Sequence, residues 1–240
     1  LRHIRRFEKM GAPDGQPFFT QALDVMGITV ETSTEQVAKI PPTGPVVVVA
    51  NHPHGLVDGL VMAELIGKVR TDYKILTRSL LTGIQEIDPF MLPVPFPHEE
   101  DSHRKSIRMR NEAMDHLKSG GVIILFPAGA VATSDTWFGP VKEKLWNPFT
   151  AKMVLKSGAQ VVPIYFPGRN TRLYQIADKI SATIRQGLLL HEIVHALNKP
   201  QSPVIGDPLS PDQFGEWKSK PGGFMAWLRS HTLALGGRTD

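Results

Sequence analysis

The sequence contains no cysteine among its 240 residues. A disulfide framework, a zinc site with thiolate ligands and a cysteine nucleophile are therefore all excluded. The same absence gives no information about the compartment in which the chain works.

Long hydrophobic runs are also lacking, since no apolar stretch approaches the roughly 20 residues that span a bilayer. The longest candidates, Pro45–Ala50 and Gly121–Phe126, have the length of a β-strand. The first residues show no signal-peptide pattern either. We therefore expect any membrane contact made by these residues to be peripheral.

The overall composition is that of a globular enzyme, with 41% hydrophobic and 21% charged residues. The length fits one large domain, with or without short additions. An excess of four positive charges suits nucleic acid, anionic lipid or an acidic protein partner. Because the chain has no recognisable nucleic-acid motif and its aromatic residues do not interleave with a basic stripe, we expect no nucleic-acid partner.

The first ten residues combine apolar and basic side chains at helical spacing. The apolar set is Leu1, Ile4, Phe7 and Met10, and the basic set between them is Arg2, Arg5, Arg6 and Lys9. This pattern is typical of a basic amphipathic helix lying on anionic lipid. It is equally typical of an ordinary helix packed on a domain with a solvated basic face, and the sequence leaves both interpretations open.

Apolar runs of strand length alternate with helical patterns along the rest of the chain. Strands are expected at Pro45–Ala50, Tyr73–Leu76, Val122–Phe126 and Gln160–Phe166, with an edge strand at Val204–Gly206. Helices are expected at Gly59–Val69, Ser102–Ser119 and Asn147–Ser157, with one or two within Leu173–Asn198 and a short one at Phe224–Leu235. Asp88–Pro97 has the composition of a loop or strand edge. The alternation predicts an α/β fold with a mostly parallel central sheet flanked by helices.

A polar segment begins where the first buried strand ends, and reads Asn51-His52-Pro53-His54-Gly55-Leu56-Val57-Asp58-Gly59. Active sites gather beyond the carboxyl ends of such strands, so His52 is expected at an opening, with Asp58 at the start of the next helix. A hydrogen bond to Asp58 would fix the imidazole tautomer and leave the other nitrogen free to accept a proton. This is the base and orienter half of a catalytic triad, with a substrate hydroxyl as nucleophile. The alternative is a structural histidine beside a helix that Asp58 caps.

A second pattern offers a different chemistry, zinc-dependent hydrolysis. His191-Glu192-Ile193-Val194-His195 would place two histidines on one helix face, where they can bind zinc with Glu192 as the base. The candidate third ligand, Glu216, lies beyond a proline-rich loop, and no third histidine follows closely. A zinc site at His52, His54 and Asp58 lacks the adjacent Asp-His pair of binuclear hydrolases. Zinc hydrolysis therefore stays an alternative to the preferred interpretation, which requires no metal.

The segment Asn51–Gly59 resembles the first motif of the lysophospholipid acyltransferase superfamily. It is closer to the bacterial branch that acylates lyso-aminolipids such as lyso-ornithine lipid. Most of the superfamily has four residues between the histidine and the aspartate, whereas five separate His52 from Asp58 and three separate His54 from Asp58. The Asn-His-Pro context matches His52, so the resemblance assigns the catalytic base to His52 and its orienter to Asp58. Asn51 and Gly55 belong to the same motif and are expected at the substrate.

The segment Leu125–Ser134 resembles a second block of that superfamily, Phe-Pro-Glu-Gly-Thr-Arg-Ser, which binds the acceptor. The expected substrate-binding residues of this block are Phe126, Pro127, Ala128 and Gly129. Ala128 takes the place of the glutamate, and Val131 takes the place of the arginine. Since that arginine would grip a phosphate as a bidentate clamp, its replacement argues against lysophosphatidic acid or glycerol phosphate as acceptor. A lyso-lipid with an amino-acid head group needs no such clamp.

Two further blocks fit the same resemblance. Val161–Phe166 resembles the superfamily's Val-Pro-Ile strand, and Gly168 and Asn170 follow it at the expected site end of the sheet. Ile75–Leu80 takes the place of the second motif, where Arg78 either faces an acyl carrier or head group or is a plain surface residue.

The resemblance covers about residues 40–210 and implies an O-acyltransferase of bacterial membrane lipid biosynthesis. A fatty acyl thioester of acyl-carrier protein or coenzyme A would be the donor and a lyso-lipid the acceptor, with no cofactor. We expect a membrane-surface helical segment at residues 1–35, a catalytic acyltransferase domain at 36–210, and a tail with a short helix at 211–240. The expected location is the cytoplasmic face of the inner membrane, with the protein bound peripherally to its anionic surface.

Overall fold

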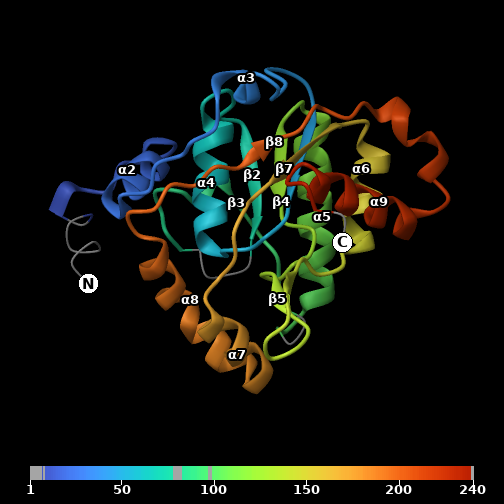
Figure 1. Cartoon of the computed structure of the whole chain (residues 1–240). Coiled ribbons are helices and arrows are strands. Elements are labelled where there is room, and N and C mark those ends of the chain that lie inside the picture. The colour runs from blue at the N-terminus through green and yellow to red at the C-terminus, as the bar shows by residue number, and fades with distance from the viewer. Residues whose placement is uncertain (1–6, 8, 78–82, 97–98, 239–240) are drawn as a thin grey trace.

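The computed structural model describes residue 7 and residues 9–77, 83–96 and 99–238 (Figure 1). Its strands are β1 (Val46–Ala50), β2 (Tyr73–Thr77), β3 (Met91–Pro93), β4 (Val122–Leu125), β5 (Thr133–Ser134), β6 (Val141–Lys142), β7 (Gln160–Tyr165) and β8 (Val204–Ile205). Its α-helices are α2 (Pro17–Met26), α3 (Thr34–Val37), α4 (Leu56–Gly67), α5 (Ser102–Lys118), α6 (Pro148–Ser157), α7 (Arg172–Ile180), α8 (Ala182–Ala196) and α9 (Pro221–Ala234). Two 3-10 segments are η2 (Asp88–Phe90) and η3 (Pro211–Trp217).

Six strands form one sheet in the order β3-β2-β4-β1-β7-β8, and only the pair β7–β8 is antiparallel. Val46, at the start of β1, is paired with Val122 on one side and Gln160 on the other. The carboxyl ends of β1, β4 and β7 therefore lie together, and β5, α7 and the start of α8 lie beyond that end (Figure 1). The predicted α/β fold with a mostly parallel sheet flanked by helices is confirmed.

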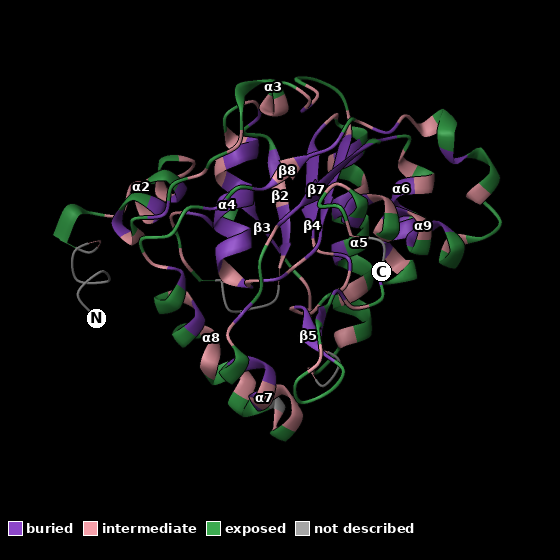
Figure 2. Ribbon diagram, in the orientation of Figure 1, coloured by how far each residue is buried: buried purple, intermediate pink, exposed green. Residues whose placement is uncertain are grey.

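Helices cover both faces of the sheet, and β1 shows how the sequence achieves this. All five residues of β1 are fully buried, and most of the sheet has the colour of buried residues in Figure 2. Val46, Val48 and Ala50 join a cluster with residues of α2, α4 and α8. Val47 and Val49 join a second cluster with residues of α5, α6 and α9. Because successive strand residues point to opposite faces, a continuous apolar run fits between two helical layers.

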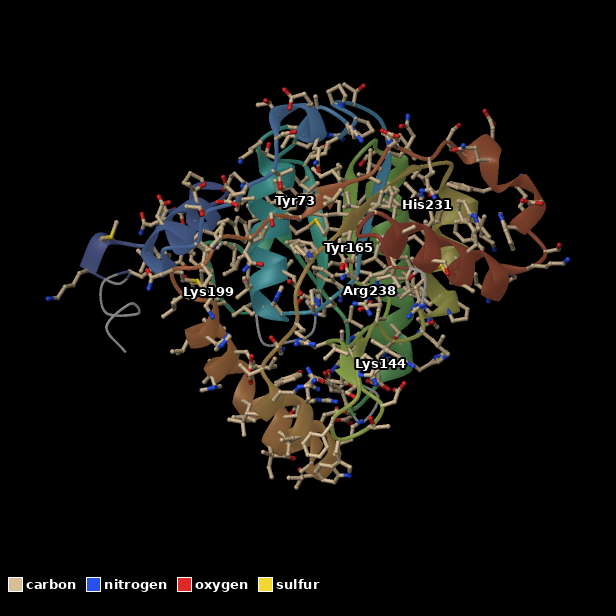
Figure 3. All side chains as sticks on the ribbon, viewed as in Figure 1. Tyr73, Lys144, Tyr165, Lys199, His231 and Arg238 are labelled. Carbon is tan, nitrogen blue, oxygen red and sulfur yellow. The ribbon has the colours of Figure 1, made fainter. Side chains whose placement is uncertain are left out.

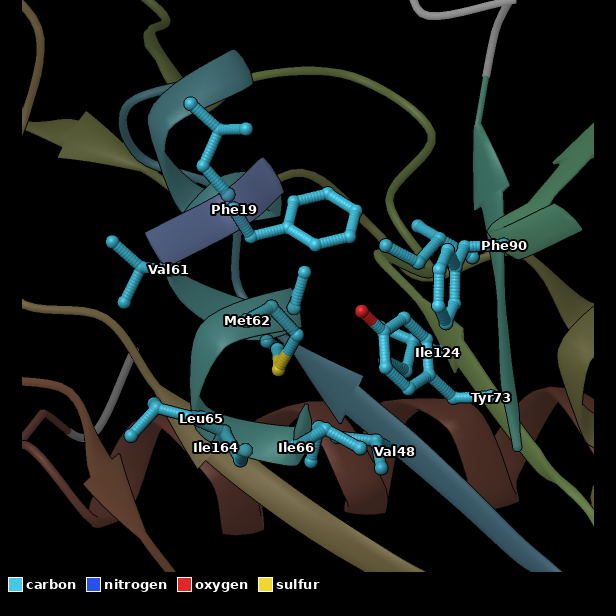
Figure 4. Packing of buried hydrophobic residues seen from close by; sticks show 14 of the residues in the cluster. Phe19, Val48, Val61, Met62, Leu65, Ile66, Tyr73, Phe90, Ile124 and Ile164 are labelled. Atoms are coloured by element: carbon cyan, nitrogen blue, oxygen red, sulfur yellow. The ribbon is translucent and has the colours of Figure 1, made fainter. Parts of the chain in front are cut away.

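Aromatic side chains link α2 to the sheet in the first cluster. The Phe90 ring lies 5.8 Å from Phe19 and 4.7 Å from Tyr73, measured between ring centroids (Figure 4). Figure 3 labels Tyr73 in the view of the whole molecule. The Tyr73 hydroxyl donates a hydrogen bond of 2.6 Å to Gln16 Oε1, so this buried phenol has a polar partner. The segment around α2 is thereby fixed against β2.

Helix α4 begins at Leu56, three residues earlier than predicted. Gly55 adopts a φ of 77°, which glycine tolerates without steric cost, and this turns the chain into the helix. Asp58 is then the third helical residue, and its carboxylate accepts the Gly55 N–H at 3.1 Å. The helix start is therefore set by a glycine turn and a side-chain cap rather than by the apolar pattern.

Two other regions that the sequence left open acquire definite structure. Leu173–Asn198 contains two helices, because Ser181 is extended (φ −161°, ψ 134°) and its side chain accepts the Thr183 N–H at the start of α8. The predicted loop or strand edge at Asp88–Pro97 forms η2 and the edge strand β3.

The two ends of the chain differ in how they relate to the domain. Helix α9 packs against α6 and β7, with Phe224 and Leu228 fully buried in the second cluster. Residues 1–6 and 8, and with them most of the predicted amphipathic helix, lie outside the described residues. The Phe7 ring packs edge-on against Phe18 at 5.1 Å.

Within the described ranges, every helix is too short or too polar to span a bilayer.

Candidate active site

The candidate site begins with Asn51, directly after β1. Its side-chain amide donates to the Phe166 carbonyl at 2.8 Å and accepts the Phe166 N–H at 2.7 Å. These two bonds connect Asn51, the residue after β1, with Phe166, the residue after β7. They extend the contact between the two strands beyond their last backbone pair, Ala50 with Ile164. Asn51 is itself buried, so it fixes the point at which the chain leaves the sheet rather than facing open space.

His52 follows at the edge of the sheet, with 18% of its side chain exposed. Its Nδ1 lies 3.0 Å from Asp58 Oδ2, and its ring stacks on Phe126 with 4.0 Å between ring centroids. When Nδ1 carries the proton toward the carboxylate, Nε2 carries the lone pair and can act as a base. The arrangement is that of a base and its orienter.

Asp58 is completely buried and accepts four hydrogen bonds. Oδ2 accepts from His52 Nδ1, the His54 N–H (2.8 Å) and the Gly55 N–H, and Oδ1 accepts from His54 Nδ1 (3.0 Å). Burial alone would raise the pKa of Asp58. The positive charge of His54 and the hydrogen bonds from both histidines outweigh burial and lower the pKa to about 2. Asp58 is therefore ionised at neutral pH.

His54 is a second histidine on the same carboxylate, and sequence reasoning assigned it no role in the preferred mechanism. Burial opposes its protonation, but the nearby charges of Asp58 and Glu192 raise its pKa overall. Its Nε2 faces Gly168, where an added Cβ would lie only 2.7 Å away. Gly168 also has a φ of 98°, so both backbone conformation and space favour glycine at this position.

Glu143 is a buried carboxyl of the site that the sequence did not reveal. Its Oε2 accepts the His52 N–H at 3.1 Å, and its Oε1 accepts from Trp146 Nε1 at 3.0 Å. Burial raises its pKa, against the opposing effect of these two bonds. The His52 carbonyl in turn accepts the Ala132 N–H at 2.8 Å. Glu143 lies 91 residues from His52 in no motif, so nothing in the sequence pairs them.

The segment Phe126–Gly129 forms a turn after β4, in which the Gly129 N–H donates to the Phe126 carbonyl at 2.9 Å. The Pro127 carbonyl accepts the Asn147 N–H at 3.0 Å, which fixes the turn against the start of α6. Phe126, Pro127 and Gly129 lie on the wall of the same cavity as His52. Ala128 packs instead against the second hydrophobic cluster.

A largely apolar cavity of about 740 Å³ opens beside His52. Its apolar lining residues include Phe19, Leu56, Leu60, Ile75, Leu76, Met91, Phe96, Met109, Leu125, Phe126, Val131, Phe149, Leu189, Leu190 and Ile193. Two cations also line it. Arg110 lies 4.3 Å above the Phe149 ring centroid, and Arg185 bonds Asp178. The size and lining suit a long hydrocarbon chain.

The remaining predicted residues are placed as follows. Gly55 lines the cavity with His52, whereas Gly168, which faces His54, and the buried Asn170, just before α7, are not among its lining residues. Arg78 lies outside the described residues. The roles assigned to these residues, and those of His52 and Asp58, stay predictions.

Glu192 and the two histidines of the zinc-binding pattern lie on different sides of α8. Glu192 is buried and accepts hydrogen bonds from the Thr171 N–H (2.9 Å) and hydroxyl (2.5 Å), so it fixes the start of α7 against α8. His191 and His195 lie on the exposed side of α8. Across the part of the chain that the structure describes, no three His, Asp or Glu side chains come together as ligands for a metal ion.

Comparisons with known proteins identify the family and the fold. The family model described as acyltransferase matches residues 9–200. The lyso-glycine lipid O-acyltransferase of Phocaeicola vulgatus is 24% identical over 212 residues, covering 85% of this chain and 73% of the relative. The lyso-glycine lipid O-acyltransferase of Bacteroides thetaiotaomicron is 23% identical over 212 residues, covering 85% and 75%.

Among solved structures, the crystal structure of the 1-acyl-sn-glycerophosphate acyltransferase PlsC from Thermotoga maritima is similar in fold. The TM-score is 0.58 at 16% identity, over 94% of this chain and 79% of that chain. The fold is therefore shared with an enzyme of acyl transfer to a lyso-lipid. Because the family model spans most of the sequence, this chain belongs to the acyltransferase family.

Proposed function

We propose that this acyltransferase moves a fatty acyl chain from a thioester donor, acyl-carrier protein or coenzyme A, to the hydroxyl of a lyso-lipid with an amino-acid head group. The main support is the hydrogen bond between His52, on the wall of a largely apolar cavity, and the buried Asp58. Val131 lines this cavity at the position where the superfamily block carries arginine, so the phosphate clamp of that block is missing. The cavity's Arg110 and Arg185 are engaged with Phe149 and Asp178. The two named relatives act on a lyso-glycine lipid, whose head group is of the proposed class.

The proposed reaction is a direct transfer without an acyl-enzyme intermediate. His52 Nε2 removes the proton of the acceptor hydroxyl, and the resulting oxygen nucleophile attacks the thioester carbonyl. The tetrahedral intermediate collapses, the carbon–sulfur bond breaks, and His52 returns the proton to the leaving thiolate. The products are the acylated lipid and a free thiol.

The surroundings of His52 hold its ring in the orientation that this reaction needs. Asp58 stays ionised, since its pKa is about 2, and stabilises the imidazolium that forms during proton transfer. Glu143 accepts the His52 N–H and Phe126 stacks on the ring, so both backbone and side chain are fixed. The base is thereby positioned before substrate binds.

As part of the same proposal, the protein works in bacterial membrane lipid synthesis, bound peripherally at the cytoplasmic face of the inner membrane. The net charge of +4 supports an anionic surface as partner, and the acceptor would be a component of that membrane.

The test is transfer of a labelled long-chain acyl group by purified protein to a panel of lyso-lipids. Lyso-glycine and lyso-ornithine lipids should be acylated, and lysophosphatidic acid should be acylated at least about tenfold more slowly. The His52→Ala protein is the negative control and should acylate none of them. Equal rates for lysophosphatidic acid and the aminolipids would contradict the head-group proposal. Equal signals from wild type and His52→Ala for every acceptor would contradict the proposed reaction.

A further inference from the structure

Large apolar side chains lie exposed on α7 and α8, at the end of the molecule that carries the candidate site. They are Leu173, Ile180, Ile184, Leu190 and Val194, of which Leu190 is 72% and Val194 is 63% exposed. Trp137 and Phe138 are exposed in the loop 135–140. Since ten such side chains are exposed among the described residues, these seven are a concentration rather than a scatter.

Helix α7 is hydrogen-bonded to the segment around the loop 135–140, so the loop and the helices α7 and α8 form one continuous surface. Arg172 donates to the Gly139 carbonyl at 2.9 Å, and the Ser134 N–H donates to Gln175 Oε1 at 2.9 Å. Figure 1 shows α7 beside β5, and α8 continuing from α7 along the same end of the molecule. The three segments together present exposed residues outward (Figure 2).

The charge of this surface is positive. Residues 169–199 contain five Arg and Lys and two acidic residues, and the loop 135–140 adds Asp135, so the surface has a net charge of +2, against +4 for the whole chain. Each of the three acids has a partner. Asp178 is paired with Lys179 and Arg185, Glu192 is buried against Thr171, and the exposed Asp135 lies 3.6 Å from Lys142 and 3.8 Å from Lys144. Exposed apolar residues flanked by an excess of cations are the pattern of a surface that lies in an anionic membrane interface.

The same helix pair forms one wall of the cavity beside His52. Gln186, Leu189 and Ile193 of α8 line the cavity, whereas Ile184 and Val194 do not and face outward. Leu190 belongs to both surfaces, since it lines the cavity and is exposed. A lipid held at the outer surface would therefore meet the cavity entrance at Leu190.

We propose that α7, α8 and the loop 135–140 form the surface by which this acyltransferase docks on an anionic phospholipid bilayer, with the entrance at Leu190 facing the lipid. The inference deepens the proposed function and rests on its lipid acceptor. An acidic carrier protein and a second copy of this chain are the other occupants that a basic apolar surface admits. The bilayer fits better, because the exposed apolar residues extend over three segments and the entrance itself is apolar.

The test is co-sedimentation of the full chain with vesicles of phosphatidylglycerol and phosphatidylethanolamine, without substrate. Val194→Asp and Ile184→Asp change outward-facing residues that lie off the cavity wall. Each should weaken vesicle binding by about tenfold or more, since a carboxylate replaces an apolar group in the interface. Thr43→Asp adds the same charge on the exposed loop before β1, at the opposite end of the sheet, and should leave binding within about twofold of wild type.

Wild-type affinity of both α8 variants for the vesicles would overturn the proposal. If the α8 variants bind vesicles normally but no longer bind acyl-carrier protein, the surface binds the carrier and the proposal is wrong. If they bind vesicles normally but change from dimer to monomer in sedimentation velocity, the surface is an interface between two copies of the chain and the proposal is wrong. Transfer to a detergent-dispersed acceptor separates this proposal from the proposed function. If the wild-type protein acylates no lyso-lipid but Val194→Asp still weakens vesicle binding, the function fails and the docking surface stands.

Discussion

At the scale of single residues, the Asp58 carboxylate is hydrogen-bonded to two histidines, and the two have different surroundings. His52 lies on the cavity wall, whereas Nε2 of His54 faces the backbone at Gly168. The residue spacing alone leaves either histidine able to reach Asp58, and the structure shows that both do. The Asn-His-Pro context predicts His52 as the base, and His52 is the one of the two histidines that lines the cavity.

The buried Asp58 predicts an acid-dependent loss of stability. Its pKa is about 2 in the folded protein against an ordinary 3.8, so the ionised form stabilises the fold above about pH 4 and this contribution is lost as the pH falls from about 4 toward 2. Asp58→Asn should therefore lower the free energy of unfolding by on the order of 2 kcal/mol near neutral pH, and by less near pH 3. Urea denaturation at both pH values measures this. The same deficit at both would contradict the ionised, hydrogen-bonded carboxylate.

Replacing Gly168 by alanine should destabilise the fold because the new methyl group would clash with His54, and Gly158 offers a control without that clash. Gly168→Ala would place a Cβ 2.7 Å from His54 Nε2, whereas Gly158 has a similar positive φ of 67° and open space around it. Both alanines strain the backbone by about 1 kcal/mol, and Gly168→Ala should cost roughly 1 to 3 kcal/mol more because His54 must shift. Denaturant unfolding compares them. Equal losses would mean that His54 is not packed against Gly168.

At the scale of elements, the sequence predicts strands and helices that have a repeating apolar pattern. It misses features set by a single glycine, by a side-chain cap or by contacts between distant segments. The Val46–Ala50 strand and the alternation of strands with helices follow from apolar periodicity. The start of α4 was wrong by three residues because Gly55 and the Asp58 cap set it. Glu143 and the lining of the cavity by α8 could not be predicted, since both depend on segments that are distant in sequence.

Helix α9 predicts that the C-terminal residues contribute to the stability of the whole domain. Phe224 is fully buried against Phe214, with 5.1 Å between ring centroids, in the second hydrophobic cluster. Phe224→Ala should lower the free energy of unfolding by about 3 to 5 kcal/mol. Phe138→Ala removes the same atoms from an 80% exposed position and should cost less than about 0.5 kcal/mol. A small loss for Phe224→Ala would contradict the packing of α9.

At the scale of the whole molecule, the two helical layers and the end of the sheet enclose one cavity that reaches from His52 to α8. Its wall comes from both hydrophobic clusters, so the cavity exists only when the full domain is assembled. His52, the proposed base, therefore lies on the wall of a cavity that can hold a hydrocarbon chain.

The shape of this cavity predicts a change in acyl-chain preference. Gly59 lines it, and a Cβ there would meet nothing within 4 Å. Gly59→Leu should fill part of the space and shift the preferred acyl donor toward shorter chains, with roughly tenfold lower kcat/KM for the longest. Gly222→Leu, at the open start of α9, is the control and should keep the wild-type preference. An unchanged chain-length profile in Gly59→Leu would place the acyl chain elsewhere.

The central claim is that His52 is the base of an acyl transfer, and the rate of transfer by His52→Ala tests it most directly. With a long-chain acyl thioester and a lyso-aminolipid, the account predicts a rate lower by on the order of 10³-fold or more, with wild-type circular dichroism and thermal stability close to normal. A folded His52→Ala protein that transfers the acyl chain at a rate within about tenfold of wild type would contradict the account.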